Sequence, residues 1–106
     1  MENTSFLNNT ISLSGQIISS FTFSHKAYGE DFYSFMLKTK RLSDNYDILP
    51  ITVPERLLIN IDAKENDFVN ILGQLRTYNS YYDNKNHLIL TVFATKIEIC
   101  CENIKI

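Results

Sequence analysis

Basic side chains gather at a few places in the sequence and are the first candidates for binding chemistry. Lys38, Lys40 and Arg41 form the densest basic cluster, and the two lysines share one face of an expected strand. Positive charges in this arrangement can follow the phosphates of a nucleic acid strand. A solvated surface charge is the alternative interpretation for each. The candidate phosphate contacts are Lys26, Lys38, Lys40, Arg41, Arg76 and Lys85.

Tyrosines supply the flat rings that such a site would also need. The chain has six Tyr and no Trp, and most of the tyrosines fall in or beside expected loops. A nucleobase that stacks on such a ring contributes about 1–3 kcal/mol whatever its identity. Alternatively, the rings cap the rim of the fold and bond to solvent. The candidate stacking residues are Tyr28, Tyr46, Tyr78, Tyr81 and Tyr82.

Residues that carry catalysis or bind metals are sparse. His25 and His87 are far apart, and no CxxC or other metal-ligand spacing is present. Cys100 and Cys101 are adjacent, and neighbours in a chain rarely bridge each other, so two reduced thiols are expected. Nucleophile motifs and phosphate-binding loops are also missing. The sequence therefore predicts a protein that is not an enzyme and has no cofactor or metal.

Period-2 alternation of apolar residues predicts strands over most of the chain. A short segment that begins with proline is the one plausible helix, and two polar segments are expected to be loops. The expected strands are Ile11–Phe23, Phe32–Lys40, Tyr46–Val53 and the two arms of a hairpin within Phe68–Ile99; the helix is Pro54–Asn60, and the loops are His25–Asp31 and Asn79–Asn86.

This order of elements predicts the fold class. Five strands with one short helix between the third and fourth are typical of the OB-fold, a five-stranded, partly open Greek-key barrel. We therefore expect an all-β protein with one short helix. Proteins of this fold bind oligonucleotides or oligosaccharides on one face, between two loops.

Length and composition indicate one ordinary globular domain. The chain has 106 residues, of which 44% are hydrophobic and 21% charged. We expect a flexible N-terminal tail at 1–8, the domain at 9–101 and a short C-terminal tail at 102–106. No membrane span or secretory signal is visible, so a cytoplasmic location is expected. The net charge of −2 counts against a simple electrostatic DNA binder, which makes the distribution of lysines important.

Two segments resemble the bacterial single-stranded DNA-binding protein family. Asn9–Ile17 (NTISLSGQI) is similar to the family's opening strand, and Val69–Thr77 (VNILGQLRT) resembles its fourth strand. The resemblance covers residues 9 to about 99 and implies an OB-fold that forms homodimers or homotetramers and binds single strands with little sequence preference. The missing tryptophans and the missing glycine- and proline-rich tail make the chain similar to a short, tail-less member, related to the primosomal replication accessory protein.

Apolar residues opposite the expected core predict a surface for association. Alternation would leave them exposed, and exposed apolar patches usually mark contacts between proteins. Alternatively, strand twist and bulges return some of them to the core. The predicted oligomer interface consists of Ile18, Leu72, Ile89 and Phe93.

The main functional hypothesis is a non-catalytic protein that coats or protects single-stranded DNA in replication, recombination or repair. Its expected partners are single-stranded DNA, further copies of itself, and replication or primosome proteins, with no membrane. The alternative is a protein-interaction OB-fold subunit of the primosomal type with weak or no DNA binding. Oligosaccharide binding has no support beyond the fold.

Overall fold

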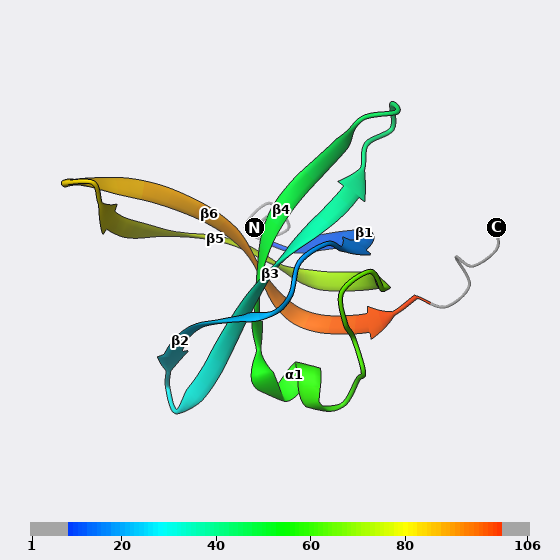
Figure 1. Cartoon of the computed structure of the whole chain (residues 1–106), viewed down its shortest axis with the longest axis horizontal. Helices are drawn as coiled ribbons and strands as arrows, with labels where there is room; N and C mark the ends of the chain where they lie inside the picture. The colour runs from blue at the N-terminus through cyan, green and yellow to red at the C-terminus, as the bar shows by residue number, and fades with distance from the viewer. Residues whose placement is uncertain (1–8, 101–106) are drawn as a thin grey trace, which may run out of the picture.

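A computed structural model describes residues 9–100 of the chain (Figure 1). The two predicted tails and Cys101 lie outside the described residues. No helix in the described range is long and apolar enough to cross a membrane. The elements in chain order are β1 (Ile11–Ile17), β2 (Thr22–Ala27), β3 (Glu30–Lys40), β4 (Tyr46–Pro54), α1 (Glu55–Ile59), β5 (Phe68–Tyr82) and β6 (Lys85–Ile99).

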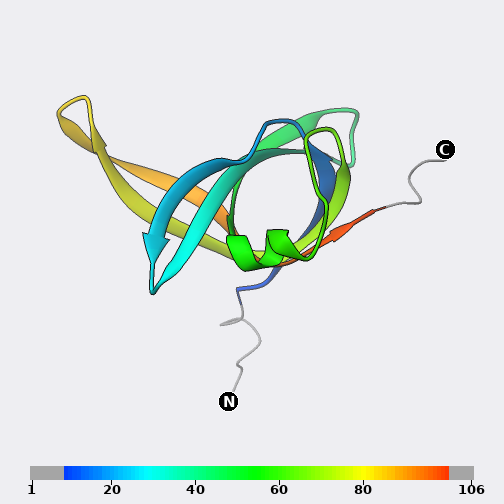
Figure 2. The same cartoon turned by 60° about the horizontal axis from the view of Figure 1, so that its bottom comes forward.

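The strands form a closed ring. Their order in the sheet is β1-β5-β6-β4-β3-β2, and β1 also pairs with β3 through Gln16 and Ile17. The neighbouring pairs are antiparallel except for β4 and β6, which run parallel with Ile51 beside Val92. Figure 2 shows the strands curving round a common axis with α1 across one end. The ring and the short helix α1 confirm the predicted OB-fold.

The first expected strand is broken in two. Ile18–Phe21 interrupt the segment that was predicted to run from Ile11 to Phe23, so β1 belongs to the ring while β2 lies at the edge of the sheet and pairs with β3. The break lets β1 turn from β5 toward β3, since the Ile18 N–H donates to the carbonyl of Met36 at 3.0 Å.

Inward-facing residues of the ring strands make up the core. Ile17, Leu37, Ile51, Val69 and Ile71 are almost completely buried, as their alternation predicts. Helix α1 packs the half-buried side chains of its apolar face against this core.

Two glycines permit close packing of the strands. A Cβ at Gly15 would meet the Lys38 carbonyl, and a Cβ at Gly73 would meet the Phe93 carbonyl. A glycine inside the first expected strand indicates a bend or a close backbone approach, and at Gly15 the structure has the close approach. Glycine is required at both positions because any side chain would push the strands apart.

The two predicted loops are wrong in extent. β5 continues to Tyr82 and β6 begins at Lys85, so the turn of this hairpin is reduced to Asp83 and Asn84, with φ values of 57° and 64°. A two-residue turn with both residues left-handed matches the twist of the flanking strands, and Asp and Asn tolerate this conformation. The β2–β3 hairpin has the same design, with Tyr28 and Gly29 at φ values of 53° and 76°. Each hairpin therefore keeps its strand pairing almost to its tip.

A bulge in β6 sets which residues share a face. Leu72 pairs with Lys96 and Gly73 pairs with Ala94, so Thr95 is the extra residue on β6. The shift brings Ile97 onto the same inward face as Val92. Strand alternation predicts Lys96 and Glu98 as an outward surface pair, and they form an exposed ion pair of 3.3 Å.

Candidate functional site

Strands β3 and β4 place basic and aromatic candidates on one outer face. Phe35 and Leu37 point into the core and are buried, so the alternate residues of β3 point outward. The pairing of β3 with β4 continues this face across both strands. Its outward pairs are Phe32–Pro54, Ser34–Thr52, Met36–Pro50, Lys38–Ile48 and Lys40–Tyr46.

A groove follows this outer face between the two hairpins. Its larger part has a volume of about 470 Å³ and is enclosed by residues from β2, β4, β5 and β6. A second part of about 340 Å³ continues toward Ser34 and Met36 on β3. Both parts share Ser24, Thr52, Tyr78 and Thr91. We call the two parts together the groove. The larger part is lined by Ser24, His25, Thr52, Arg76, Thr77, Tyr78, Thr91 and Phe93.

Four flat side chains form a continuous row at the groove. The imidazole of His25 stacks on the ring of Phe32 with centroids 4.8 Å apart and planes 7° apart. The ring of Phe32 lies 5.4 Å from that of Phe93, and the guanidinium carbon of Arg76 lies 4.2 Å from the centroid of Phe93. The row crosses from β2 through β3 and β6 to β5. It brings a cation and an imidazole to the two ends of an aromatic pair.

Gln74 orients the cation at the end of the row. Its Oε1 accepts hydrogen bonds from Nη2 of Arg76 at 3.1 Å and from Nε at 3.4 Å. Because Gln74 and Arg76 are two residues apart on one strand, their side chains lie on the same face. The guanidinium is thus held on one edge by an amide and on one face by a ring.

A second cation–aromatic pair lies farther along the same face. Nζ of Lys38 is 4.4 Å from the centroid of the Tyr46 ring. At the tip of the β5–β6 hairpin, Tyr82 stacks on His87 with centroids 3.8 Å apart and planes 8° apart. Lys85 lies opposite Tyr82 in the ladder and is exposed. The face therefore carries charge and flat rings along its length.

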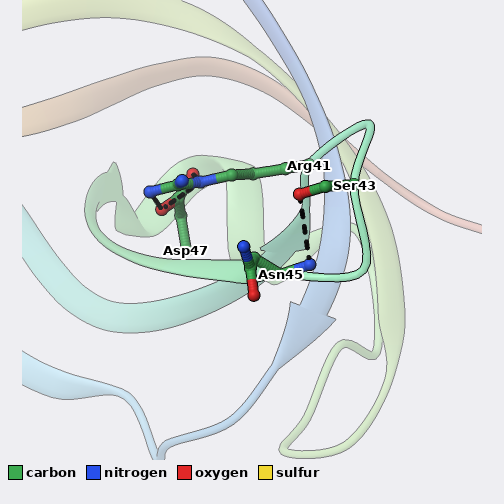
Figure 3. Close-up of polar contacts among 4 residues, drawn as sticks. All are labelled: Arg41, Ser43, Asn45 and Asp47. Carbon is green, nitrogen blue, oxygen red and sulfur yellow. Dashed lines mark hydrogen bonds and ion pairs between the residues drawn. The ribbon is translucent and has the colours of Figure 1, made fainter.

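Two predicted cations have ion-pair partners within the chain. Arg41 donates to both carboxylate oxygens of Asp47, with its Nε at 3.0 Å from Oδ1 and 2.9 Å from Oδ2 and its Nη2 at 2.7 Å from Oδ1 (Figure 3). The hydrogen bonds from Arg41 lower the pKa of the Asp47 carboxyl, and the same contact raises the pKa of Arg41. Lys26 pairs with Asp31 at 3.2 Å. Their roles as phosphate contacts stay predictions.

The structure brings some of the predicted tyrosines together and separates others. Tyr46, Tyr78 and Tyr82 lie on the same face as Lys38, Lys40 and Arg76, as the strand pairing requires. Tyr81 points to the opposite face of β5, and Tyr28 is fully exposed at the β2–β3 turn. The last two therefore lie outside the groove.

Three residues of the row were not predicted as ligand contacts. His25 was assigned to a loop, and Phe93 was assigned to the oligomer interface. The sequence places Phe32 on the same strand face as Lys38 and Lys40, a face that suits a flat and anionic ligand, but Phe32 itself was not named as a contact. Alternation could have identified Phe93, because it falls on the non-core face of β6 just as Arg76 does on β5.

The four residues of the predicted oligomer interface do not share one surface. Ile89 and Phe93 line the groove, and Ile18 lies in the break between β1 and β2. Leu72 lies in a hollow with the polar side chains of Ser12, Asn70, Lys96 and Glu98. Their role in association stays a prediction.

A different set of apolar residues forms an exposed surface, which we call the apolar face. Leu75, Leu88 and Leu90 are 41%, 71% and 51% exposed on the side of the β5–β6 hairpin opposite the groove. A small cleft joins Leu75 and Leu90 to the half-buried Ile11, Leu13 and Leu49. In the sequence these three leucines alternate with the core residues Ile71 and Val92, so period-2 alternation assigns them to the core. That assignment is wrong because the hairpin extends beyond the barrel.

The described residues hold no group of three or more His, Cys, Asp and Glu side chains that could bind a metal ion. Nδ1 of His25 is 2.9 Å from Oγ of Ser24, and its ring is stacked.

Comparison with known proteins relates this architecture to one solved structure in particular. The N-terminal domain of PriB protein from Thermoanaerobacter tencongensis is 42% identical to this chain, with a TM-score of 0.75. The alignment covers 89% of this chain and 98% of that domain. This chain belongs to the PriB family. The likeness confirms the sequence resemblance to short relatives of this kind, and the PriB domain is described as dimeric.

A second structure supports the fold of this PriB-family chain. The mitochondrial single-stranded DNA-binding protein Rim1 from S. cerevisiae has a TM-score of 0.66 at 18% identity. The alignment covers 85% of this chain and 92% of Rim1. No family model matches the chain, and no curated protein matches it.

Proposed function

We propose that this protein is a non-catalytic single-stranded DNA-binding protein of the PriB family that acts in DNA replication. The observation that carries the proposal is the row His25–Phe32–Phe93–Arg76 beside a groove of about 470 Å³. Single strands are bound by flat rings that stack bases and by cations that track the backbone. The row supplies both in one place, because its two ends are the exposed imidazole of His25 and the guanidinium of Arg76.

The second cation–aromatic pair extends the same chemistry along the face. Lys38 over Tyr46 and Arg76 over Phe93 are pairs of a kind that contribute about 0.5–1 kcal/mol at exposed sites. Because the rings already hold these cations in place, less side-chain freedom is lost when a DNA strand binds them. Tyr78 lines both parts of the groove between them and offers its ring to a base. The strand is expected to pass from Arg76 across Thr52 and Ser34 toward Lys38.

We further propose that the protein is a homodimer that associates through the apolar face. Three exposed leucines, Leu75, Leu88 and Leu90, are an unfavourable surface for a monomer. Leu75 and Leu90 share a cleft with residues of β1. In the described part of the chain, only Gln16 and Ile17 of β1 pair with β3. The dimeric PriB domain supports this assembly. The groove is on the other side of the hairpin, so a dimer would present two grooves.

The test is a titration of fluorescent oligo-dT at two salt concentrations. We expect affinity to fall as salt rises, because bound counterions are released from the phosphates. Arg76→Ala should weaken binding about 10- to 150-fold, since a hydrogen-bonded charge contributes roughly 1.5–3 kcal/mol. Arg56→Ala is the matched control, because Arg56 is on α1 and pairs with Glu30 at 3.0 Å. Absence of binding at low salt, or equal losses in the two variants, would contradict the proposal.

Several finer parts of the sequence hypothesis stay predictions. They are the roles in repair and recombination, a tetrameric state, primosome partners and a cytoplasmic location. The exposed apolar face is assigned to the homodimer, so within residues 9–100 no further surface favours the protein-interaction alternative over DNA binding.

A further inference from the structure

We propose that the groove holds one base-reading position, built by Arg76 and Thr52, that favours guanine. The inference rests on the proposed binding of single-stranded DNA and deepens it. Most of the groove offers flat surfaces and charge, which tolerate any sequence. These two residues instead present a fixed pattern of hydrogen-bond donors and acceptors.

The donors come from the guanidinium of Arg76. Its Nε and one hydrogen of Nη2 are directed to Oε1 of Gln74, and its plane is held over Phe93. The edge formed by Nη1 and the second hydrogen of Nη2 has no other partner among residues 9–100. An orientation fixed in this way leaves a two-donor fork at the lining of the groove. A fork of this shape pairs with two neighbouring acceptor atoms in one plane.

The acceptor is the hydroxyl oxygen of Thr52 on the groove floor. Oγ1 of Thr91 donates its one hydrogen to the carbonyl of Pro50 at 3.1 Å. In the 2.9 Å contact between the two threonine hydroxyls, Thr52 must therefore be the donor. Its hydrogen is then committed, and only its lone pairs remain for a ligand. Thr52 is 8% exposed, so its orientation is fixed by burial as well.

This pattern suits a base edge better than a phosphate. A phosphate diester has acceptor oxygens alone, and these would repel the lone pairs of Thr52. Guanine offers the acceptors O6 and N7 to an arginine fork and has N–H donors on the adjoining edge. Adenine places a donor beside N7, and thymine lacks a pair of adjacent acceptors on this side. Cytosine has adjacent acceptors and an amino group, so it is the base that tests the assignment most closely.

The experiment compares short oligo-dT strands that carry one central substitution, by competition against labelled oligo-dT at fixed salt. One dG should strengthen binding about fivefold or more over all-dT, and over dA and dC, because a bidentate arginine contact discriminates to this degree. A 7-deaza-dG in the same place lacks the N7 acceptor and should lose most of the gain. This arm uses the unaltered protein, so folding of a variant does not enter.

Variants then assign the two residues. The ratio of dG to dT affinity should fall toward one in Arg76→Lys, which keeps the charge without the fork, and in Thr52→Val, which keeps the shape without the oxygen. Thr52→Ser should preserve the ratio. Equal affinities for all four bases, a dC gain as large as that of dG, or a gain that survives in 7-deaza-dG would overturn the inference. Failure to bind any strand, all-dT included, would overturn the proposed function itself.

Discussion

The β5–β6 hairpin has two faces that differ in almost every property that determines binding. One carries Arg76, Tyr78 and Tyr82 beside the groove, and the other carries Leu75, Leu88 and Leu90. Both faces are made by the same alternating ladder. Figure 1 shows that the hairpin, drawn in yellow and orange, extends well away from the barrel.

The difference between the faces follows from where the barrel ends. In the lower half of the hairpin the inward residues, such as Ile71 and Val92, are buried in the core. In the half nearer the turn, the same side of the ladder extends beyond the barrel, so its leucines are exposed. The alternation of apolar residues therefore continues along the hairpin beyond the residues that form the core. Another protein surface is expected to cover these exposed leucines. The polar face of the hairpin then remains available to a ligand.

The largest expected effect comes from a charge on the apolar face. Leu90→Glu should convert the dimer to a monomer, because each copy loses a contact that is worth about 1.5–3 kcal/mol when fully buried. A two-fold interface loses it twice, so the dimer dissociation constant should rise more than about 100-fold. Light scattering coupled to gel filtration measures the mass directly.

Leu72→Glu is the control for this change. Leu72 is 40% exposed, close to the exposure of Leu75, but it lies among polar side chains outside the apolar face. Its variant should keep the dimer mass. A dimeric Leu90→Glu protein, or dissociation caused by the change at Leu72, would show that the apolar face has been assigned to the wrong residues.

A smaller effect is expected from a ring on the groove face. Tyr78→Ala should weaken oligo-dT binding by about 1–3 kcal/mol, or roughly 5- to 150-fold, because a stacked base loses its platform. Circular dichroism should remain that of the folded protein, since Tyr78 is 54% exposed.

Tyr28→Ala provides the comparison for the tyrosines. Tyr28 lies at the β2–β3 turn outside the groove lining, and its ring is fully exposed. Its removal should change affinity less than twofold. If the two variants lose affinity equally, stacking depends on exposed tyrosines in general, and the division between groove and surroundings is wrong.

The fold could be predicted from the sequence because most of it is encoded locally. Alternation marks β1 and the lower halves of β5 and β6, glycine marks the close approach at Gly15, and proline marks the start of α1. The hairpin tip was missed because Asn79–Asn86 is rich in residues that favour turns. Two of them, Asp83 and Asn84, are enough to make the turn, and the rest extend the ladder.

The site was harder to predict, for a physical reason. Alternation places Arg76 and Phe93 on outward faces, but their contact depends on the register between β5 and β6. The bulge at Thr95 changes the face parity along β6, and the pairing of His25 with Phe32 depends on a similar shift in β2. The candidate residues could therefore be predicted from residue type. The row that joins them can be recognised only once the pairing of the strands is known.

The smallest expected effect concerns the β3–β4 turn and tests how far the groove face extends. Asp47→Asn removes the carboxylate that holds Arg41 in Figure 3, so the guanidinium becomes free to contact a phosphate. Oligo-dT affinity should rise a few-fold at low salt, and the slope of log K against log salt should steepen by up to about 0.7. Unchanged affinity and slope would place Arg41 outside the path of the strand.

The same variant has a defined dependence on pH. Arg41 lowers the pKa of Asp47 in the folded state, so this pair stabilises the fold above the unfolded pKa of the carboxyl. That contribution is lost as the pH falls through the lowered folded pKa. Thermal melts should therefore show a slightly higher Tm for the native protein than for Asp47→Asn at pH 7, and the difference should vanish in strong acid. The difference should remain small because both side chains are solvent-exposed. A gap in Tm that persists in strong acid would mean that the substitution disturbs the turn itself, and the gain in affinity could not then be assigned to Arg41.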